Sequence, residues 1–130
     1  MKMTNRYTRI ALLSLAVAMF TAASARADTY SWTNFQSDIA GVAQHTDPNL
    51  VNPWGLALVD NELWVGNFGD GLINVYDPVT GAFIETLMQA DGTPLQFDGL
   101  WDLLPLGDGV YFTAGIADEA HGLFGLITED

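Results

Sequence analysis

Few residues of this sequence have the types and spacing needed for metal-ion chemistry. The segment Asn67-Phe68-Gly69-Asp70-Gly71 places amide and carboxylate oxygens beside glycines, and such oxygens are the ligands that Ca²⁺ takes. The complete D-x-[DN]-x-[DN]-G loop with its later Glu is missing. A tight hairpin turn explains the same residues. The segment therefore leaves two hypotheses open, a Ca²⁺ site that uses Asn67 and Asp70 or a plain turn.

A second candidate is the segment Asp118-Glu119-Ala120-His121. Its letters match a helicase box, but the sequence has no P-loop and no lysine to complete one. As a metal site it would use Asp118, Glu119 and His121 together with another carboxylate. The alternative is a polar loop between strands, because single histidines occur in many structural settings.

The remaining polar pairs are weaker candidates. His45 and Asp47 stand two residues apart, but Asp47-Pro48 is also an ordinary start of a turn. Paired carboxylates near Trp101 would suit a glycosidase, although acid on surface turns explains them as well. Serine catalysis is disfavoured, because Ser31 and Ser37 are not in a G-x-S-x-G motif. The carboxylates in question are Asp98, Asp102 and Asp108.

Charge is distributed very unevenly along the 130 residues. The four basic residues are all in the first 26 positions, and the 16 acidic residues all follow them. A chain that starts at Asp28 would have 103 residues (130 − 27) and a side-chain charge of −16. Such a chain lacks the basic residues that bind nucleic-acid phosphates, and it lacks the lysine of a P-loop or a Schiff base. Cysteine is absent, which excludes disulfides and thiolate chemistry.

The first 27 residues have the pattern of a signal peptide. Lys2, Arg6 and Arg9 precede an apolar run from Ile10 to Ala23, and Ala25-Arg26-Ala27 fits a small-x-small cleavage site. The run is shorter than the roughly 20 residues that a membrane anchor needs. The sequence therefore predicts an exported protein, periplasmic or extracellular, with no membrane span after leader removal.

Glycine and proline punctuate the rest of the sequence every few residues, and no helical period is sustained. This pattern predicts an all-β fold of short strands joined by turns. The expected strands are Trp54–Val59, Leu63–Asn67, Leu72–Tyr76, Ala82–Met88, Leu100–Leu106, Val110–Ala114 and Gly122–Thr128.

An internal repeat relates two parts of this series. Trp54 aligns with Trp101 at an offset of 47 residues (101 − 54), and Leu63 to Val65 align with Val110 to Phe112 at the same offset. A period of roughly 40–50 residues with four short strands is typical of propeller blades. We expect one domain over 28–130, with blades at about 54–90 and 98–128. The second blade would take its fourth strand from 30–35, and the two tryptophans would lie in the core.

Residues 63–77 resemble an NHL-type β-propeller repeat. Three stretches, 46–55, 65–77 and 111–125, resemble an uncharacterised family of exported bacterial proteins with a predicted propeller fold. The resemblance implies two β-propeller-like blades that form an incomplete ring. Three chains could then complete a six-bladed homo-oligomer. The family supplies no activity and no catalytic residues to transfer.

Three functional hypotheses follow. The first is an exported module with a non-catalytic binding or structural role, whose ligand is unknown. The second is a Ca²⁺-dependent hydrolase of the lactonase type, with the candidate metal residues above. The third is a truncated product without a function.

Overall fold

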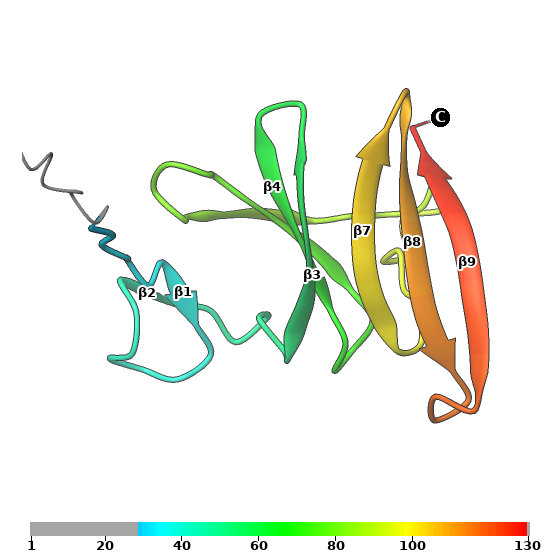
Figure 1. The fold of residues 1–130 in the computed structure, drawn as a ribbon, viewed down its shortest axis with the longest axis horizontal. Helices are drawn as coiled ribbons and strands as arrows, with labels where there is room; N and C mark the ends of the chain where they lie inside the picture. The colour runs from blue at the N-terminus through cyan, green and yellow to red at the C-terminus, as the bar shows by residue number, and fades with distance from the viewer. Residues whose placement is uncertain (1–28, 130) are drawn as a thin grey trace, which may run out of the picture. The chain divides into compact units, whose positions relative to one another are not determined.

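From Gln36 onward the chain alternates short strands with tight turns, as the glycine and proline pattern predicts. The computed structural model describes residues 29–129, and residues 31–129 belong to one compact unit. Two short strands, β1 (Gln36–Ser37) and β2 (His45–Thr46), pair in parallel. The other strands form two antiparallel sheets in sequence order (Figure 1). The first sheet has β3 (Pro53–Val59), β4 (Glu62–Asn67), β5 (Ile73–Tyr76) and β6 (Phe83–Thr86), and the second has β7 (Leu100–Leu106), β8 (Gly109–Ile116) and β9 (His121–Thr128).

The predicted all-β class is confirmed, and the two sheets do not close on each other. The second sheet has three strands, because residues 30–35 carry no strand and β1 pairs with β2 instead. The expected signal peptide, residues 1–27, lies outside the described residues. Within residues 29–129 no helix is long and apolar enough to span a membrane.

The internal repeat is visible in the strand pairing. Leu56 pairs with Val65 in the first sheet, and Leu103 pairs with Phe112 in the second. Both residues of the second pair stand 47 positions after those of the first (103 − 56 and 112 − 65). The pair Leu58–Leu63 and its counterpart Pro105–Val110 keep this offset. The two hairpins therefore share one register, as the sequence repeat predicts.

Equivalent positions in the two sheets have opposite exposure. Leu56 is 62% exposed, whereas its counterpart Leu103 is 3% exposed. Ala57 is 4% exposed, whereas its counterpart Leu104 is 58% exposed. The interface between the sheets thus joins the Ala57 face of the first sheet to the Leu103 face of the second. Repeat-equivalent faces of the two sheets therefore point in the same direction, as they do in stacked repeat proteins.

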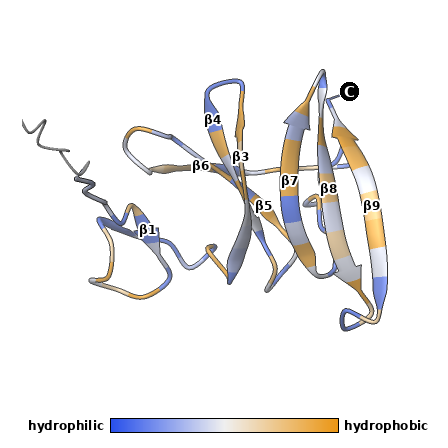
Figure 2. Ribbon diagram, in the orientation of Figure 1, coloured by the Kyte–Doolittle hydropathy of each residue, from blue (hydrophilic) through white to orange (hydrophobic). Residues whose placement is uncertain are grey.

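The core lies between these two faces. Leu100 and Ile73 are fully buried, and Leu103, Val110 and Phe112 pack with them. Glycine makes the close approach of the sheets possible, because a Cβ on Gly66 would lie 2.8 Å from the Leu100 side chain. Figure 2 shows that apolar residues are also prominent along β7 and β9. These strands therefore carry more apolar side chains than the core between the sheets buries.

The expectation that Trp54 and Trp101 lie in the core is wrong. Each occupies a shift in strand register, the first between Pro53 and Gly55 and the second between Leu100 and Asp102. An extra residue at such a bulge breaks the inward–outward alternation. Trp54 is accordingly 57% exposed and Trp101 38% exposed. The repeat relation between the two residues holds, but what they share is a bulge and not a core position.

Candidate functional site

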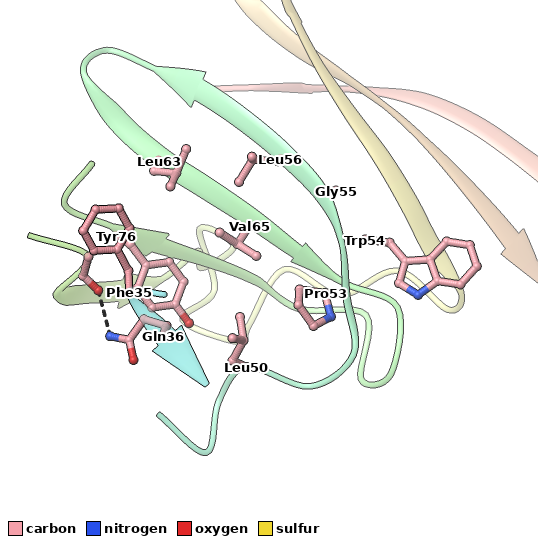
Figure 3. Close-up of a pocket in the computed structure, with 11 residues that line it drawn as sticks. Phe35, Gln36, Leu50, Pro53, Trp54, Gly55, Leu56, Leu63, Val65 and Tyr76 are labelled. Atoms are coloured by element: carbon pink, nitrogen blue, oxygen red, sulfur yellow. Dashed lines mark hydrogen bonds between the residues drawn. The ribbon is translucent and has the colours of Figure 1, made fainter. Parts of the chain in front are cut away.

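A pocket opens on the outer face of the first sheet, between β1 and strands β3 to β5 (Figure 3). Its volume is about 340 Å³. The wall is almost entirely apolar, and among the lining side chains only those of Gln36, Trp54 and Tyr76 contain polar atoms. The lining residues are Phe35, Gln36, Leu50, Pro53, Trp54, Gly55, Leu56, Leu63, Val65, Tyr76 and Gly81. A wall of this kind suits apolar side chains or a small apolar ligand.

Gln36 fixes one side of the pocket. Its Nε2 donates a hydrogen bond of 2.7 Å to the carbonyl of Gly81, in the turn between β5 and β6. Its Oε1 is buried and accepts no hydrogen bond from the described residues. A buried polar atom without a hydrogen-bond partner lowers the free energy of unfolding by about 1–3 kcal/mol.

The loop before β3 is held on the sheet by a buried acid. Asp47 is 6% exposed, and its Oδ2 accepts a hydrogen bond of 2.9 Å from the hydroxyl of Tyr76. Its Oδ1 accepts a hydrogen bond of 2.9 Å from the backbone nitrogen of Asn49. One carboxylate thus closes the turn after itself and ties the loop to β5.

Two buried asparagines bind the same loop. The Nδ2 groups of Asn67 and Asn74 both donate to the carbonyl of Asn49, each at 2.7 Å. The Oδ1 of Asn74 accepts a further hydrogen bond of 2.7 Å from the hydroxyl of Thr86. The Oδ1 of Asn67 is buried and accepts none from the described residues. Strands β4 and β6 each contribute one side chain to this network and β5 contributes two, and we call the network the loop anchor (Asp47, Asn49, Asn67, Asn74, Tyr76 and Thr86).

Burial is the largest cause that raises the pKa of the Tyr76 hydroxyl above its ordinary value, followed by the hydrogen bond to Asp47 and the charge of that carboxylate. An ionised phenol in this place would have to face the Asp47 carboxylate across a short distance. Tyr76 therefore stays protonated and acts as a hydrogen-bond donor. The structure gives it a positioning role for the loop and the pocket wall.

Asn67 and Asp70, the two residues of the predicted calcium site, have separate roles. Asn67 is fully buried in the loop anchor. Asp70 closes a turn, because its Oδ1 accepts a hydrogen bond of 3.1 Å from the backbone nitrogen of Leu72. Its backbone carbonyl accepts a further hydrogen bond of 2.7 Å from Nε2 of Gln96. The hairpin turn is present, and the calcium assignment stays a prediction.

Asp118 and Glu119 lie in the turn between β8 and β9, and His121 is the first residue of β9. All three are exposed. Ala117, Asp118 and Glu119 have φ angles of 58°, 54° and 63°, which makes a left-handed turn. Over residues 29–129 no three His, Asp or Glu side chains gather closely enough to hold a metal ion. Asn67 and Asp70 lie at the β4–β5 hairpin of the first sheet, and the other three lie at the β8–β9 hairpin of the second.

The weaker candidates also have local partners. Nε2 of His45 lies 3.2 Å from the carbonyl of Thr80, and Oδ2 of Asp98 accepts a hydrogen bond of 2.9 Å from the nitrogen of Ala117. Oδ1 of Asp102 accepts one of 2.9 Å from the nitrogen of Leu103. Oγ of Ser37 accepts one of 3.1 Å from the nitrogen of Ile39. These contacts hold turns and strand ends.

Exposed leucines extend both outer sheet faces. On the first sheet Leu56 and Leu58 of β3 are 62% and 60% exposed beside the pocket. On the second sheet Leu104 and Leu106 of β7 are 58% and 64% exposed. The stacked pair Tyr111–Phe124, with ring centroids 5.7 Å apart, lies on the same outer face as Leu104. We call these surfaces the first outer face (Leu56 and Leu58) and the second outer face (Leu104, Leu106, Tyr111 and Phe124).

Sequence comparison finds similarity to two uncharacterized proteins of Acanthamoeba polyphaga mimivirus. One is 33% identical over 91 residues, which cover 62% of this chain and 24% of the relative. The other is 51% identical over 35 residues, which cover 27% of this chain and 9% of the relative. The chain therefore spans a quarter or less of the length of these relatives. No family model matches the chain, and no solved structure matches it.

These findings correct the resemblance drawn from residues 46–55, 65–77 and 111–125. The relatives that match are viral and uncharacterized, and no NHL or other propeller family matches. The repeat of two hairpins stands on the strand register alone. Short glycine-rich β-hairpins satisfy the same local pattern in many folds, which explains why the motif by itself misleads.

Proposed function

We propose that this chain is an exported, non-catalytic assembly module whose copies bind each other head to tail. The observation that carries the proposal is the inverted exposure of repeat-equivalent residues. Leu103 is buried against the first sheet, while its counterpart Leu56 is 62% exposed. Ala57 is buried against the second sheet, while its counterpart Leu104 is 58% exposed. The two outer faces are therefore counterparts of the two faces that already meet inside the molecule.

The contact between copies would repeat the internal one. The first outer face of one copy would pack on the second outer face of the next, so Leu56 and Leu58 would meet Leu104 and Leu106. Such a contact is heterologous, and it produces a ring when the rotation closes and a filament when it does not. The pocket beside Leu56 adds apolar wall to one side of this contact.

Charge sets the conditions for assembly. Asp102 stands where the first sheet has Gly55, so a neighbour meets a carboxylate on the second outer face. The sequence after Arg26 also contains 16 acidic residues and no Lys or Arg. Repulsion between copies is screened by salt and falls as carboxylates are protonated. We expect assembly to strengthen with salt concentration and with decreasing pH.

Light scattering on a sizing column tests the proposal with the purified protein in low and high salt. The expected result is a mass of several chains at high salt. Leu56→Glu and Leu104→Glu should each reduce the mass, and Val79→Glu, in an exposed turn, should not.

Mixing the two leucine variants distinguishes a head-to-tail contact from a symmetric one. Each variant keeps one intact face, so an equal mixture should form a two-chain complex that neither variant forms alone. A monomeric wild-type protein at high salt would overturn the proposal. So would a Leu104→Glu variant that assembles like the wild type.

A further inference from the structure

The four edge strands of the two sheets differ in how they are protected from pairing. Natural sheets guard their edges with proline, charge, bulges or short length. β3 begins with Pro53 and is bulged, and β6 has only four residues and includes Glu85. β7 is bulged and contains Asp102 and Pro105. Each of these three edges therefore has at least two protecting features.

The edge strand β9 has none of them. It is eight residues long, from His121 to Thr128, and contains no Pro, Asp, Glu, Lys or Arg. It pairs with β8 over its full length without a shift in register. No strand among residues 29–129 pairs with its other edge. Leu123, Phe124 and Leu126 are 40%, 70% and 49% exposed along it. A long, regular, apolar edge is a template for one more strand.

Charges at both ends of β9 indicate the nature of that strand. Asp118 and Glu119 precede it, and both are exposed. Glu129 follows it, and Asp108 lies at the same end because the neighbouring Gly109 pairs with Thr128. The uncharged middle of β9 is thus flanked by carboxylates at each end, and no Lys or Arg occurs after Arg26 to compensate them.

A second copy of this chain fits the edge poorly. Antiparallel pairing of β9 with itself would place Glu129 of one copy near Asp118 and Glu119 of the other. Parallel pairing would place like ends side by side. Acid faces acid in both arrangements, and like charges across a sheet are destabilising. A strand with basic residues at both ends matches the charges in either direction.

We propose that the outer edge of β9 binds an extended peptide by strand addition, and that the peptide has alternating β-branched residues in its middle and Lys or Arg at both ends. Backbone hydrogen bonds to β9 supply the affinity and the flanking acids supply the selectivity. This site differs from the assembly contact, because assembly uses the outer face of the second sheet, to which β9 contributes the Phe124 side chain, whereas the peptide would use the backbone edge of β9. A failure of one proposal leaves the other standing.

A labelled synthetic peptide, Lys-Lys-Val-Thr-Val-Thr-Val-Lys-Lys, tests this site by fluorescence anisotropy with the full protein. We expect saturable binding that weakens as salt concentration rises. Two control peptides separate the contributions. One carries Glu in place of Lys, and the other carries N-methyl groups on alternate backbone nitrogens. Both should fail to bind, since the first loses the charge match and the second loses the backbone donors along one edge.

Two charge-matched variants locate the binding. Asp118→Asn with Glu119→Gln should weaken binding by up to about fivefold per lost ion pair. Asp60→Asn with Glu85→Gln removes the same charge from the first sheet and should leave the affinity unchanged. Amide hydrogen exchange should slow in β9 when the peptide is bound. Absence of binding would overturn the proposal. Equal weakening by both variants, or equal binding of the N-methylated peptide, would also overturn it, because either result indicates general attraction of a cation.

Discussion

The hydroxyl of Tyr76 donates a hydrogen bond of 2.9 Å to Oδ2 of Asp47, and the two residues are 29 positions apart in the sequence. Both are buried, at 2% and 6% exposure. This bond fastens the loop before β3 to the middle of the first sheet. Since the loop forms one wall of the pocket, the bond also sets the shape of that wall.

Removal of the Tyr76 hydroxyl should destabilise the protein. Tyr76→Phe leaves Oδ2 of the buried Asp47 without its donor, and an unsatisfied buried acceptor costs about 1–3 kcal/mol. Urea unfolding of both proteins measures the difference. Tyr111→Phe is the matched control, because the hydroxyl of Tyr111 makes no side-chain hydrogen bond within the described residues. Equal stability of Tyr76→Phe and the wild type would contradict the role of this bond.

Alkaline pH should weaken the fold through the same residue. The pKa of Tyr76 is raised in the folded protein, chiefly by burial and then by Asp47. The unfolded chain therefore loses this proton at lower pH than the folded chain does. The contribution to stability is complete below the ordinary tyrosine pKa of about 10 and declines as pH rises above it. Denaturant titrations from neutral to strongly alkaline pH should show a steeper decline in the wild type than in Tyr76→Phe.

The two asparagines of the loop anchor should differ in their contribution to stability. Asn74→Ala removes two hydrogen bonds, to the Asn49 carbonyl and from Thr86, and we expect a loss of about 1–3 kcal/mol. Asn67→Ala removes one such bond together with an Oδ1 that has no partner among the described residues. The loss of stability in Asn67→Ala should therefore be smaller than in Asn74→Ala. Equilibrium unfolding ranks the two variants, and the reverse order would show that Oδ1 of Asn67 is satisfied in solution.

Two glycines with similar backbone angles should respond differently to alanine. Gly71 and Gly92 have φ angles of 74° and 82°, so alanine is strained by about 1–2 kcal/mol at either position. A Cβ on Gly92 would meet nothing within 4 Å, whereas a Cβ on Gly71 would lie 2.1 Å from the carbonyl oxygen of Phe97. Gly71→Ala should therefore cost at least twice as much as Gly92→Ala in thermal or urea unfolding. Equal losses would mean that residues 96–97 do not lie against this turn.

Burial should make Leu100 contribute more to stability than Trp54, the exposed repeat counterpart of Trp101. Leu100 is fully buried, and Leu100→Ala should cost about 2–5 kcal/mol. Trp54→Ala should cost less despite the larger side chain, because Trp54 is 57% exposed, with its ring stacked on that of Phe68 at a centroid distance of 5.0 Å. If Trp54→Ala lowered the stability as much as Leu100→Ala does, Trp54 would have to be buried in the core.

Local pattern in the sequence determined the strands, the turns and the repeat. Alternation of apolar residues and the placement of glycine and proline act over a few residues, so they specify β3 to β9 to within two residues at each end. The offset from Leu56 to Leu103 is likewise a property of the linear chain, and the strand register preserves it. The uneven charge distribution needs no structure to be seen.

Only the tertiary structure decided which face of each strand is buried and which polar residues meet. The bulges at Trp54 and Trp101 turn large aromatic side chains outward, although hydropathy alone favours burial. The loop anchor brings Asp47 and Asn49 to Asn67, Asn74 and Tyr76, and no spacing in the sequence predicts these contacts. The reason is physical: a residue's pairing across the sheet depends on the fold of the intervening chain, whereas its tendency to form a strand depends on its neighbours.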